Sequence, residues 1–180
     1  MNIETPASAI TNDADDKIKI IDCDVHPALP GGLATLFPLM PKPWVERFKL
    51  KGGHLAVAAP LGFRFEHPTG SAARRDAFTP EGKPPGSDPE YMRRDLLDAH
   101  GISTAVLTSL QAGQFGTVSS GPDESAVIVS AFNDYFLDVW PLKEEKRLRL
   151  AMTVSVQDPR AAAAEIPRAR NGDSESEETS

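Results

Sequence analysis

The chain of 180 residues lacks several features that would assign it to a class at once. Its single cysteine, Cys23, excludes an internal disulfide, which fits a reducing compartment such as the cytoplasm. No apolar run approaches the ~20 residues of a membrane span. The N-terminus has neither the basic nor the apolar region of a secretory signal. We therefore expect a cytoplasmic protein that has no membrane partner.

Strong charge of one sign is also missing from most of the chain, although the net charge is −7. Residues 1–16 contribute −4 and residues 171–180 another −4, so subtraction leaves about +1 for the body between them. The body has no basic stripe with interleaved aromatic residues, so we expect no nucleic-acid partner. A hydrophobic content of 40% is enough for one globular domain with a core.

The first part of the chain has few regular elements. Residues 1–16 are polar and aperiodic, which predicts a disordered leader. The β-rich segment 17–25 predicts a strand, and helical patches are expected around 32–39 and 43–49. Residues 50–90 contain six glycines and six prolines, which predicts a long irregular insertion after the first strand. An insertion of this length inside a compact domain is usually functional or disordered.

A helix is expected where regular structure resumes. Asp88 is a good N-cap and is followed by proline and glutamate, which suit the first helical turn. Gly101 can take the left-handed conformation that ends a helix. The apolar residues between them predict a buried stripe consisting of Met92, Leu96 and Ala99.

Further strands and helices alternate along the rest of the chain. Strands are predicted at 103–110 and 148–156, separated by a Gly/Ser loop and a helix from Pro122 to Pro141. The apolar face of that helix is expected to consist of Ile128, Phe132, Tyr135, Phe136 and Val139. Another helix opens after Asp158. This alternation predicts an α/β protein with a parallel sheet and right-handed crossovers.

The pattern is lost near the end of the chain. Pro167 falls in the second turn of the last helix, and residues 167–180 carry no large apolar side chain, which predicts a disordered acidic tail. Three strands would leave a parallel sheet with unpaired edges. We therefore expect a truncated domain over residues 17–166, for which a frameshift near 165–167 is our hypothesis. Its open edges would favour self-association, whereas a small domain with an ordinary tail is the simpler interpretation.

The end of the first strand carries the clearest chemical signal. Side chains alternate along a strand, so Asp22, Asp24 and His26 are predicted on one face, with Cys23 on the other as a small core residue. Catalytic groups of parallel α/β proteins gather at the carboxyl ends of strands. Carboxylate and imidazole together suit Zn²⁺, with Mn²⁺ or Fe²⁺ as alternatives.

Four segments in this order resemble the amidohydrolase superfamily, in particular the amidohydrolase-related branch that includes carboxymuconate-semialdehyde decarboxylase-like enzymes. The resemblance covers about residues 17–166. The segments are IDCDVHP, PLMPKPWVERF, DLLDAHGISTAVLTSL and SAFNDYFLDVWPLKEEKRLRLAMTVSVQDPRAAAAEI.

The resemblance implies a (β/α)₈ barrel, of which this chain supplies about the first three β/α units, with a divalent metal at its mouth. Asp24 and His26 match the two metal ligands of the first strand, and Asp22 matches a frequent acidic neighbour that supports them. Trp44 lies in a segment that borders the substrate pocket in similar proteins. The substrate would be a small molecule, and the implied reaction is attack of metal-activated water on an amide, ester or lactone, or non-oxidative decarboxylation.

The resemblance also implies that essential parts are missing. A complete barrel needs about 250 residues, and the later histidines and the catalytic aspartate would follow residue 166. We therefore expect no catalytic residue in this chain, weak metal binding and little or no activity. The remaining histidines, His54, His67 and His100, are not expected in the site.

Two other interpretations stay open. Haloacid dehalogenase-like phosphatases also begin with apolar residues and Asp-x-Asp; there Asp22 would be the nucleophile and Asp24 the acid. A small non-catalytic α/β binding or interaction module would leave Asp24 and His26 without a metal.

Overall fold

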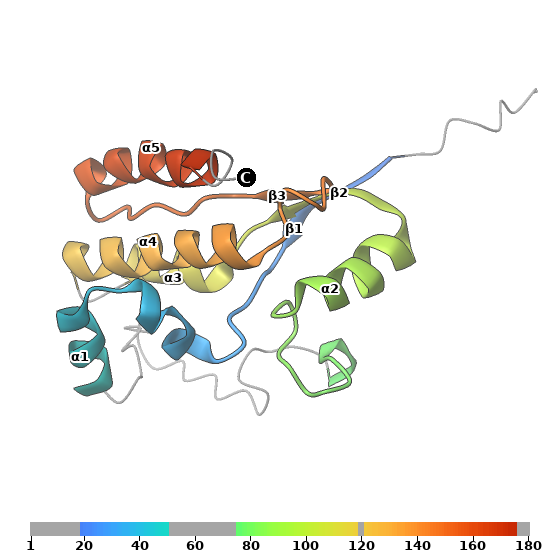
Figure 1. Cartoon of the computed structure of the whole chain (residues 1–180), viewed down its shortest axis with the longest axis horizontal. Helices are drawn as coiled ribbons and strands as arrows, with labels where there is room; N and C mark the ends of the chain where they lie inside the picture. Colours follow the sequence, from blue (N-terminus) through green and yellow to red (C-terminus); the bar gives the residue numbers. More distant parts are fainter. Residues whose placement is uncertain (1–18, 51–74, 119–120, 176–180) are drawn as a thin grey trace, which may run out of the picture.

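The computed structural model describes residues 19–50, 75–118 and 121–175. This part of the chain is a mixed α/β fold with one parallel sheet, in the order β1-β2-β3 (Figure 1). The strands are β1 (Ile20–Val25), β2 (Ile102–Leu107) and β3 (Leu148–Leu150). The predicted α/β class and parallel pairing are confirmed. Within the described residues the sheet is open, with β1 and β3 at its edges.

Helices connect the strands, and those expected near residues 32–39 and 43–49 are confirmed. In chain order the helical elements are η1 (Gly32–Leu39), α1 (Lys42–Leu50), η2 (Arg75–Ala77), α2 (Pro89–Met92), η3 (Arg93–Asp98), α3 (Leu110–Val118), α4 (Pro122–Val139) and α5 (Pro159–Glu175). No helix in the described part of the chain is both long and apolar enough to cross a membrane.

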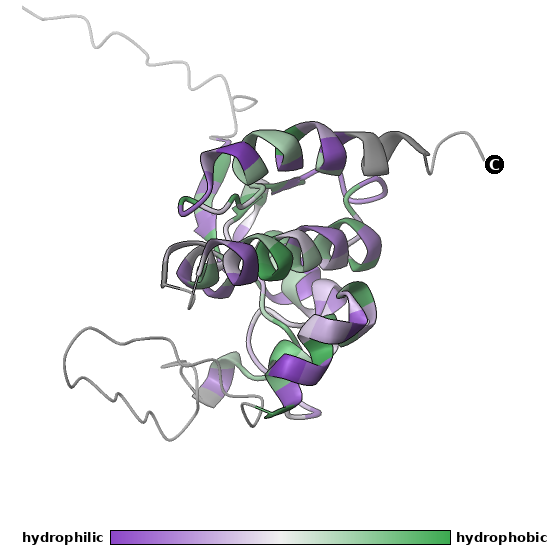
Figure 2. Ribbon diagram, turned by 90° about the vertical axis from the view of Figure 1, so that its left-hand side faces the viewer, coloured by the Kyte–Doolittle hydropathy of each residue, from purple (hydrophilic) through white to green (hydrophobic). Residues whose placement is uncertain are grey.

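Helix α4 lies at the centre of the molecule, between α5 on one side and η1 with α1 on the other (Figures 1 and 2). Ile128, Phe132 and Phe136 on this helix are at most 1% exposed. The rings of Phe132 and Phe136 stack with centroids 6.1 Å apart, and Trp140 meets Phe136 edge-on at 6.2 Å. The predicted apolar face is correct except for Val139, which is 50% exposed at the end of the helix.

The helix after Asp88 begins and ends as predicted and buries Met92 as expected, but the rest of the predicted stripe is wrong. The Asp88 carboxylate accepts a hydrogen bond of 3.0 Å from the backbone N–H of Tyr91, and the chain turns after the helix at Gly101 with φ of +62°. The buried apolar side chains are Met92 and Leu97, whereas Leu96 is partly buried and Ala99 is exposed. The reason is that η3 is a π-helix, whose wider turn brings residues five apart onto one face.

Strand β2 is shorter than predicted and is followed by a helix, α3, where a Gly/Ser loop was expected. Ser109 begins this helix, since its hydroxyl accepts a hydrogen bond from the backbone N–H of Ala112. Gly116 has a packing role: an added Cβ would lie 3.0 Å from the carbonyl oxygen of Val154. Gly116, one of the glycines that indicated a loop, therefore allows α3 to approach the segment after β3.

Strand β3 is also shorter than the predicted strand 148–156. Its partner β2 ends at Leu107, so the residues after Leu150 leave the sheet and pack against helices. The Asn133 side chain forms the backbone hydrogen bonds that a neighbouring strand would otherwise form. Its oxygen accepts from Thr153 N–H at 3.1 Å, and its nitrogen donates to the Thr153 carbonyl at 2.9 Å.

Helix α5 continues through Pro167 to Glu175, so the expected break at this proline and disordered tail from it were wrong for residues 167–175. Contacts on both sides of Pro167 hold the helix against α4. Glu165 is buried and accepts hydrogen bonds from Ser130, Asn133 and Arg168. Arg168 also donates to Asp134 at 2.7 Å. The leader 1–16, the end 176–180, His54 and His67 lie outside the described residues.

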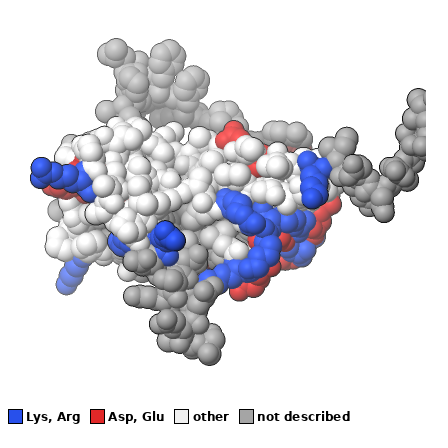
Figure 3. Space-filling view, turned by 90° about the horizontal axis from the view of Figure 1, so that it is seen from above, with Lys and Arg blue, Asp and Glu red and all other residues white. Residues whose placement is uncertain are grey.

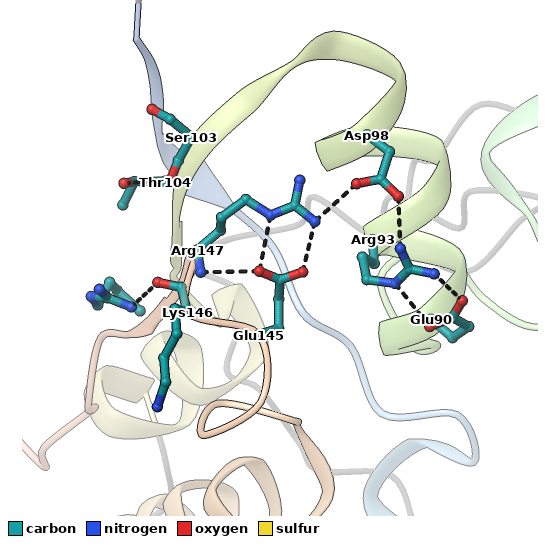
Figure 4. Close-up of polar contacts among 9 residues, drawn as sticks. Glu90, Arg93, Asp98, Ser103, Thr104, Glu145, Lys146 and Arg147 are labelled. Atoms are coloured by element: carbon teal, nitrogen blue, oxygen red, sulfur yellow. Dashed lines mark hydrogen bonds and ion pairs between the residues drawn. The ribbon is translucent and has the colours of Figure 1, made fainter.

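A network of charged side chains joins η3 to the segment before β3 (Figure 4). Arg147 donates to both carboxylate oxygens of Glu145, at 2.9 and 2.6 Å, and lies 2.9 Å from Asp98. Arg93 links Asp98, at 2.7 Å, to Glu90. Figure 3 shows acidic and basic side chains interleaved at the end of the molecule where the strands begin. The network stabilises the end of the sheet opposite the predicted site.

The Glu145–Arg147 pair predicts a stability difference that depends on pH. The hydrogen bonds from Arg147 lower the pKa of Glu145 from 4.5 to about 2. The pair therefore stabilises the fold fully above pH 4.5, and this contribution is lost as the pH falls through 2. In urea unfolding, Glu145→Gln should cost about 1 kcal/mol at pH 7 and clearly less near pH 2, where the folded carboxyl is half protonated. Glu46→Gln, in an exposed pair with Lys49, is the control and should change little at either pH. An equal loss at both pH values would contradict the assignment.

The course of α5 through Pro167 predicts that Pro167→Ala stabilises the protein. Proline inside a helix lacks the N–H for one hydrogen bond, so alanine should raise the free energy of unfolding by about 1–3 kcal/mol. Pro159→Ala is the matched control, because Pro159 is the first residue of the same helix, where proline is favoured. Urea unfolding followed by circular dichroism measures both. An unchanged Pro167→Ala variant would mean that the helix ends before this residue.

Candidate functional site

The structure brings Asp24 and His26 together at the carboxyl end of β1. The nearest carboxylate oxygen of Asp24, Oδ1, lies 3.6 Å from Nε2 of His26. The Asp24 side chain is 78% exposed and the imidazole 38% exposed. Both groups are thus open to an ion from solution, at the edge of the sheet where the sequence predicts a site.

Thr108 fixes the orientation of this pair from the next strand. Its carbonyl oxygen lies 2.8 Å from Nδ1 of His26. A carbonyl can only accept, so Nδ1 carries the proton and Nε2, facing Asp24, keeps its lone pair in the neutral ring. The Thr108 hydroxyl donates to Asp24 Oδ1 at 3.2 Å. A histidine that ligates a metal through Nε2 commonly has its other nitrogen held in this way.

Sequence reasoning did not identify Thr108. The residue follows β2 directly, and its backbone N–H donates to the Val25 carbonyl at 2.7 Å, which continues the parallel pairing past the end of the strand. The available signal was that the carboxyl ends of parallel strands meet at one edge, so a polar residue after the second strand lies near the end of the first.

Asp22 lies two residues before Asp24 and hydrogen-bonds to the Asp24 backbone. Asp22 Oδ1 accepts a hydrogen bond of 3.1 Å from the backbone N–H of Asp24. This local turn coincides with a shift in the register between β1 and β2 that falls between Asp22 and Val25. Asp22 therefore shapes the chain at Asp24, and its role beside a metal stays a prediction.

Cys23 is exposed, so its predicted place in the core was wrong. The neighbouring Ile21 is 59% exposed as well. Strand β1 is an edge of the open sheet, and its alternation is interrupted by register shifts. Ile21 and Cys23 are consequently exposed, whereas Val25, at the end of the strand, is buried in the core.

Trp44 lies on α1, away from the end of β1 in sequence, and is partly buried. Its ring stacks on Phe48 with centroids 6.1 Å apart, and the Arg47 guanidinium lies 5.3 Å from the ring centroid. These contacts come from its own helix, so a place for Trp44 beside a substrate stays a prediction. His100, at the end of the helix before β2, is exposed.

Two cavities of the described structure lie elsewhere. The larger, about 410 Å³, is between α4 and α5 and is lined by residues such as Val127, Ser130 and Glu165. The second, about 300 Å³, lies between α4, α5 and β3. Neither is lined by Asp24 or His26, so the candidate ligands are on a surface and not in either cavity.

The geometry of Asp24 and His26 suits two ligands of one metal ion. With ligand distances of about 2.0–2.2 Å, two donors of a tetrahedral zinc ion are about 3.4 Å apart, close to the 3.6 Å between Nε2 and Oδ1. Among residues 19–50, 75–118 and 121–175, no group of three or more His, Cys, Asp or Glu side chains could hold a metal. The described residues therefore bring at most two such donors together at this point, and metal binding by them stays a prediction.

Models of known protein families do not match this chain, and no curated protein matches it either. The resemblance to amidohydrolases thus stays a prediction that depends on the residues quoted above.

The contact with Thr108 predicts the tautomer of His26. At alkaline pH, where histidines are neutral, the ring should carry its proton on Nδ1, although free histidine favours Nε2. Long-range ¹H–¹⁵N correlation spectra distinguish the two forms, and His26→Ala assigns the signals. The exposed His100 should show the ordinary Nε2–H form and serves as the internal control. A His26 ring protonated on Nε2 would contradict the geometry.

Proposed function

We propose that this chain is the N-terminal part of a metal-dependent hydrolase of the amidohydrolase type, in which Asp24 and His26 are the ligands from the first strand. The observation that carries the proposal is the orientation of His26: Nδ1 is held by the Thr108 carbonyl, and Nε2 faces the Asp24 carboxylate. A side chain held in this way is prepared to bind a cation without losing rotamer freedom.

The fold supports the proposal in a general way. Parallel strands joined through helices, with polar groups at their carboxyl ends, suit the first three β/α units of a (β/α)₈ barrel. In a barrel, β1 and β3 would each have a further neighbour. Until such neighbours are supplied, we propose that the unpaired edges favour self-association.

The donor set favours zinc, with manganese or iron as alternatives. When bound, the divalent metal would supply Lewis acidity, either to activate water for hydrolysis of an amide, ester or lactone or to assist decarboxylation of a small-molecule substrate. The residues described here have simpler roles: His26 and Asp24 bind, and Thr108 and Asp22 orient them. Two donors predict weak binding, and we propose little or no catalysis by this chain alone.

A non-catalytic binding module is the second candidate. The observation that favours it is that Asp24 and His26 can satisfy each other, because a protonated imidazole would pair with the carboxylate 3.6 Å away. This alternative predicts a protein that unfolds cooperatively and is indifferent to divalent cations.

Titration with Zn²⁺ distinguishes the two candidates. Isothermal calorimetry of the full chain should show one weak site, and the melting temperature should rise with Zn²⁺ concentration, because binding to the folded state stabilises it. Asp24→Ala and His26→Ala should each lower the affinity by about 10-fold or more. His100→Ala, which removes an exposed histidine elsewhere, should bind like the parent protein.

Two results would overturn the proposed site. One is a parent protein that binds no Zn²⁺, Mn²⁺ or Fe²⁺, which favours the binding module. The other is binding that persists unchanged in both Asp24→Ala and His26→Ala, which would place the cation on other residues.

A further inference from the structure

The chain immediately after β1 is in backbone contact with a loop that is distant in sequence. The carbonyl oxygen of Gly86 accepts a hydrogen bond of 2.8 Å from the backbone N–H of Ala28. A Cβ added to Gly86 would lie 2.1 Å from the carbonyl oxygen of His26, 3.3 Å from its carbonyl carbon and 3.5 Å from Ala28 N. Real Cβ atoms essentially never approach another heavy atom within 3.0 Å. Only glycine therefore allows the two segments to lie this close.

The loop that carries Gly86 is held by its own hydrogen bonds. Two hydrogen bonds join Thr79 and Lys83. Thr79 N–H donates to the Lys83 carbonyl at 3.2 Å, and Lys83 N–H donates to the Thr79 hydroxyl at 3.1 Å. The Ser87 hydroxyl donates to the Pro84 carbonyl at 2.7 Å, and Lys83 pairs with Asp88 at 2.6 Å. Thr79 and Ser87 are buried. The loop is thus a fixed support against which the His26 backbone rests.

His26 is consequently held on two sides. The Thr108 carbonyl orients the ring from β2, and Gly86 fixes the backbone from the loop before α2. Displacing the His26 carbonyl would tilt the peptide that carries the ring and would weaken the hydrogen bond from Nδ1, because hydrogen bonds lose strength steeply when their geometry departs from linear.

We propose that Gly86 is a positioning residue for His26: by lacking a side chain, it lets the Thr79–Asp88 loop set the ring so that Nε2 faces Asp24. The part of this proposal that concerns metal affinity rests on the proposed function. The part that concerns the orientation of the ring does not.

Gly86→Ala and Gly82→Ala form a matched pair of variants. Both glycines have positive φ, +74° and +82°, so alanine is strained at either position. An added Cβ at Gly82 meets no atom within 4 Å, whereas at Gly86 it meets His26. The difference between the variants therefore isolates the contact with His26 from the strain of the backbone.

The His26 tautomer, measured by long-range ¹H–¹⁵N spectra on the full chain, and Zn²⁺ affinity, measured by calorimetry, are the two readouts. Gly86→Ala should reduce the Nδ1–H form of His26 and lower Zn²⁺ affinity by 10-fold or more. Gly82→Ala should leave both as in the parent protein. Equal effects of the two variants would overturn the proposal.

Ala28→Pro provides a second test if Gly86→Ala does not fold. This variant removes the N–H that donates to Gly86 and places a ring carbon where the hydrogen was, so it breaks the contact from the side of Ala28 without straining Gly86. It should also shift His26 away from the Nδ1–H form, and an unchanged ring would overturn the proposal.

The two readouts separate this proposal from the proposed function. If the parent protein binds no Zn²⁺ but Gly86→Ala alone changes the tautomer, the positioning role stands and the metal site fails. If the parent binds Zn²⁺ and Gly86→Ala binds it equally with an unchanged tautomer, the metal site stands and the positioning role fails.

Discussion

Parallel pairing of β1 with β2 is the constraint on which the candidate site depends. The two strands run in the same direction, so their carboxyl ends lie at one edge of the sheet. The bond from Thr108 N–H to the Val25 carbonyl extends the pairing beyond the strands and brings the Thr108 carbonyl within 2.8 Å of His26. The backbone pairing alone places the Thr108 carbonyl beside the His26 imidazole, although the two residues are far apart in sequence.

The rest of the fold depends on helix α4. Its apolar face forms the core, and Asn133 on its other side bonds both the Thr153 backbone and Glu165 of α5. A buried amide that makes three hydrogen bonds fixes the two segments in one arrangement, because leaving these groups unpaired would cost free energy. The segment after β3 is held in place although it belongs to no strand.

The two ends of the sheet carry different kinds of polar residues. Where the strands begin, Arg147, Glu145 and Asp98 form ion pairs that join neighbouring elements, and their charges satisfy one another. Where the strands end, Asp24 and His26 are exposed and have bonding capacity left. This division is typical of parallel α/β proteins, in which one end of the strands stabilises the fold and the other carries chemistry.

The sequence by itself determined the features that depend on neighbouring residues: the α/β class, the helix start at Asp88 and the presence of Asp24 and His26 at the end of a strand. Tertiary structure decided what depends on distant partners. Thr108 became part of the site through strand pairing, and β3 ended early because β2 has no more residues to pair with. Contacts with α4 keep residues beyond Pro167 helical against their local preference. Local patterns report the preference of the backbone, whereas packing and hydrogen bonds between distant segments can outweigh it by several kcal/mol.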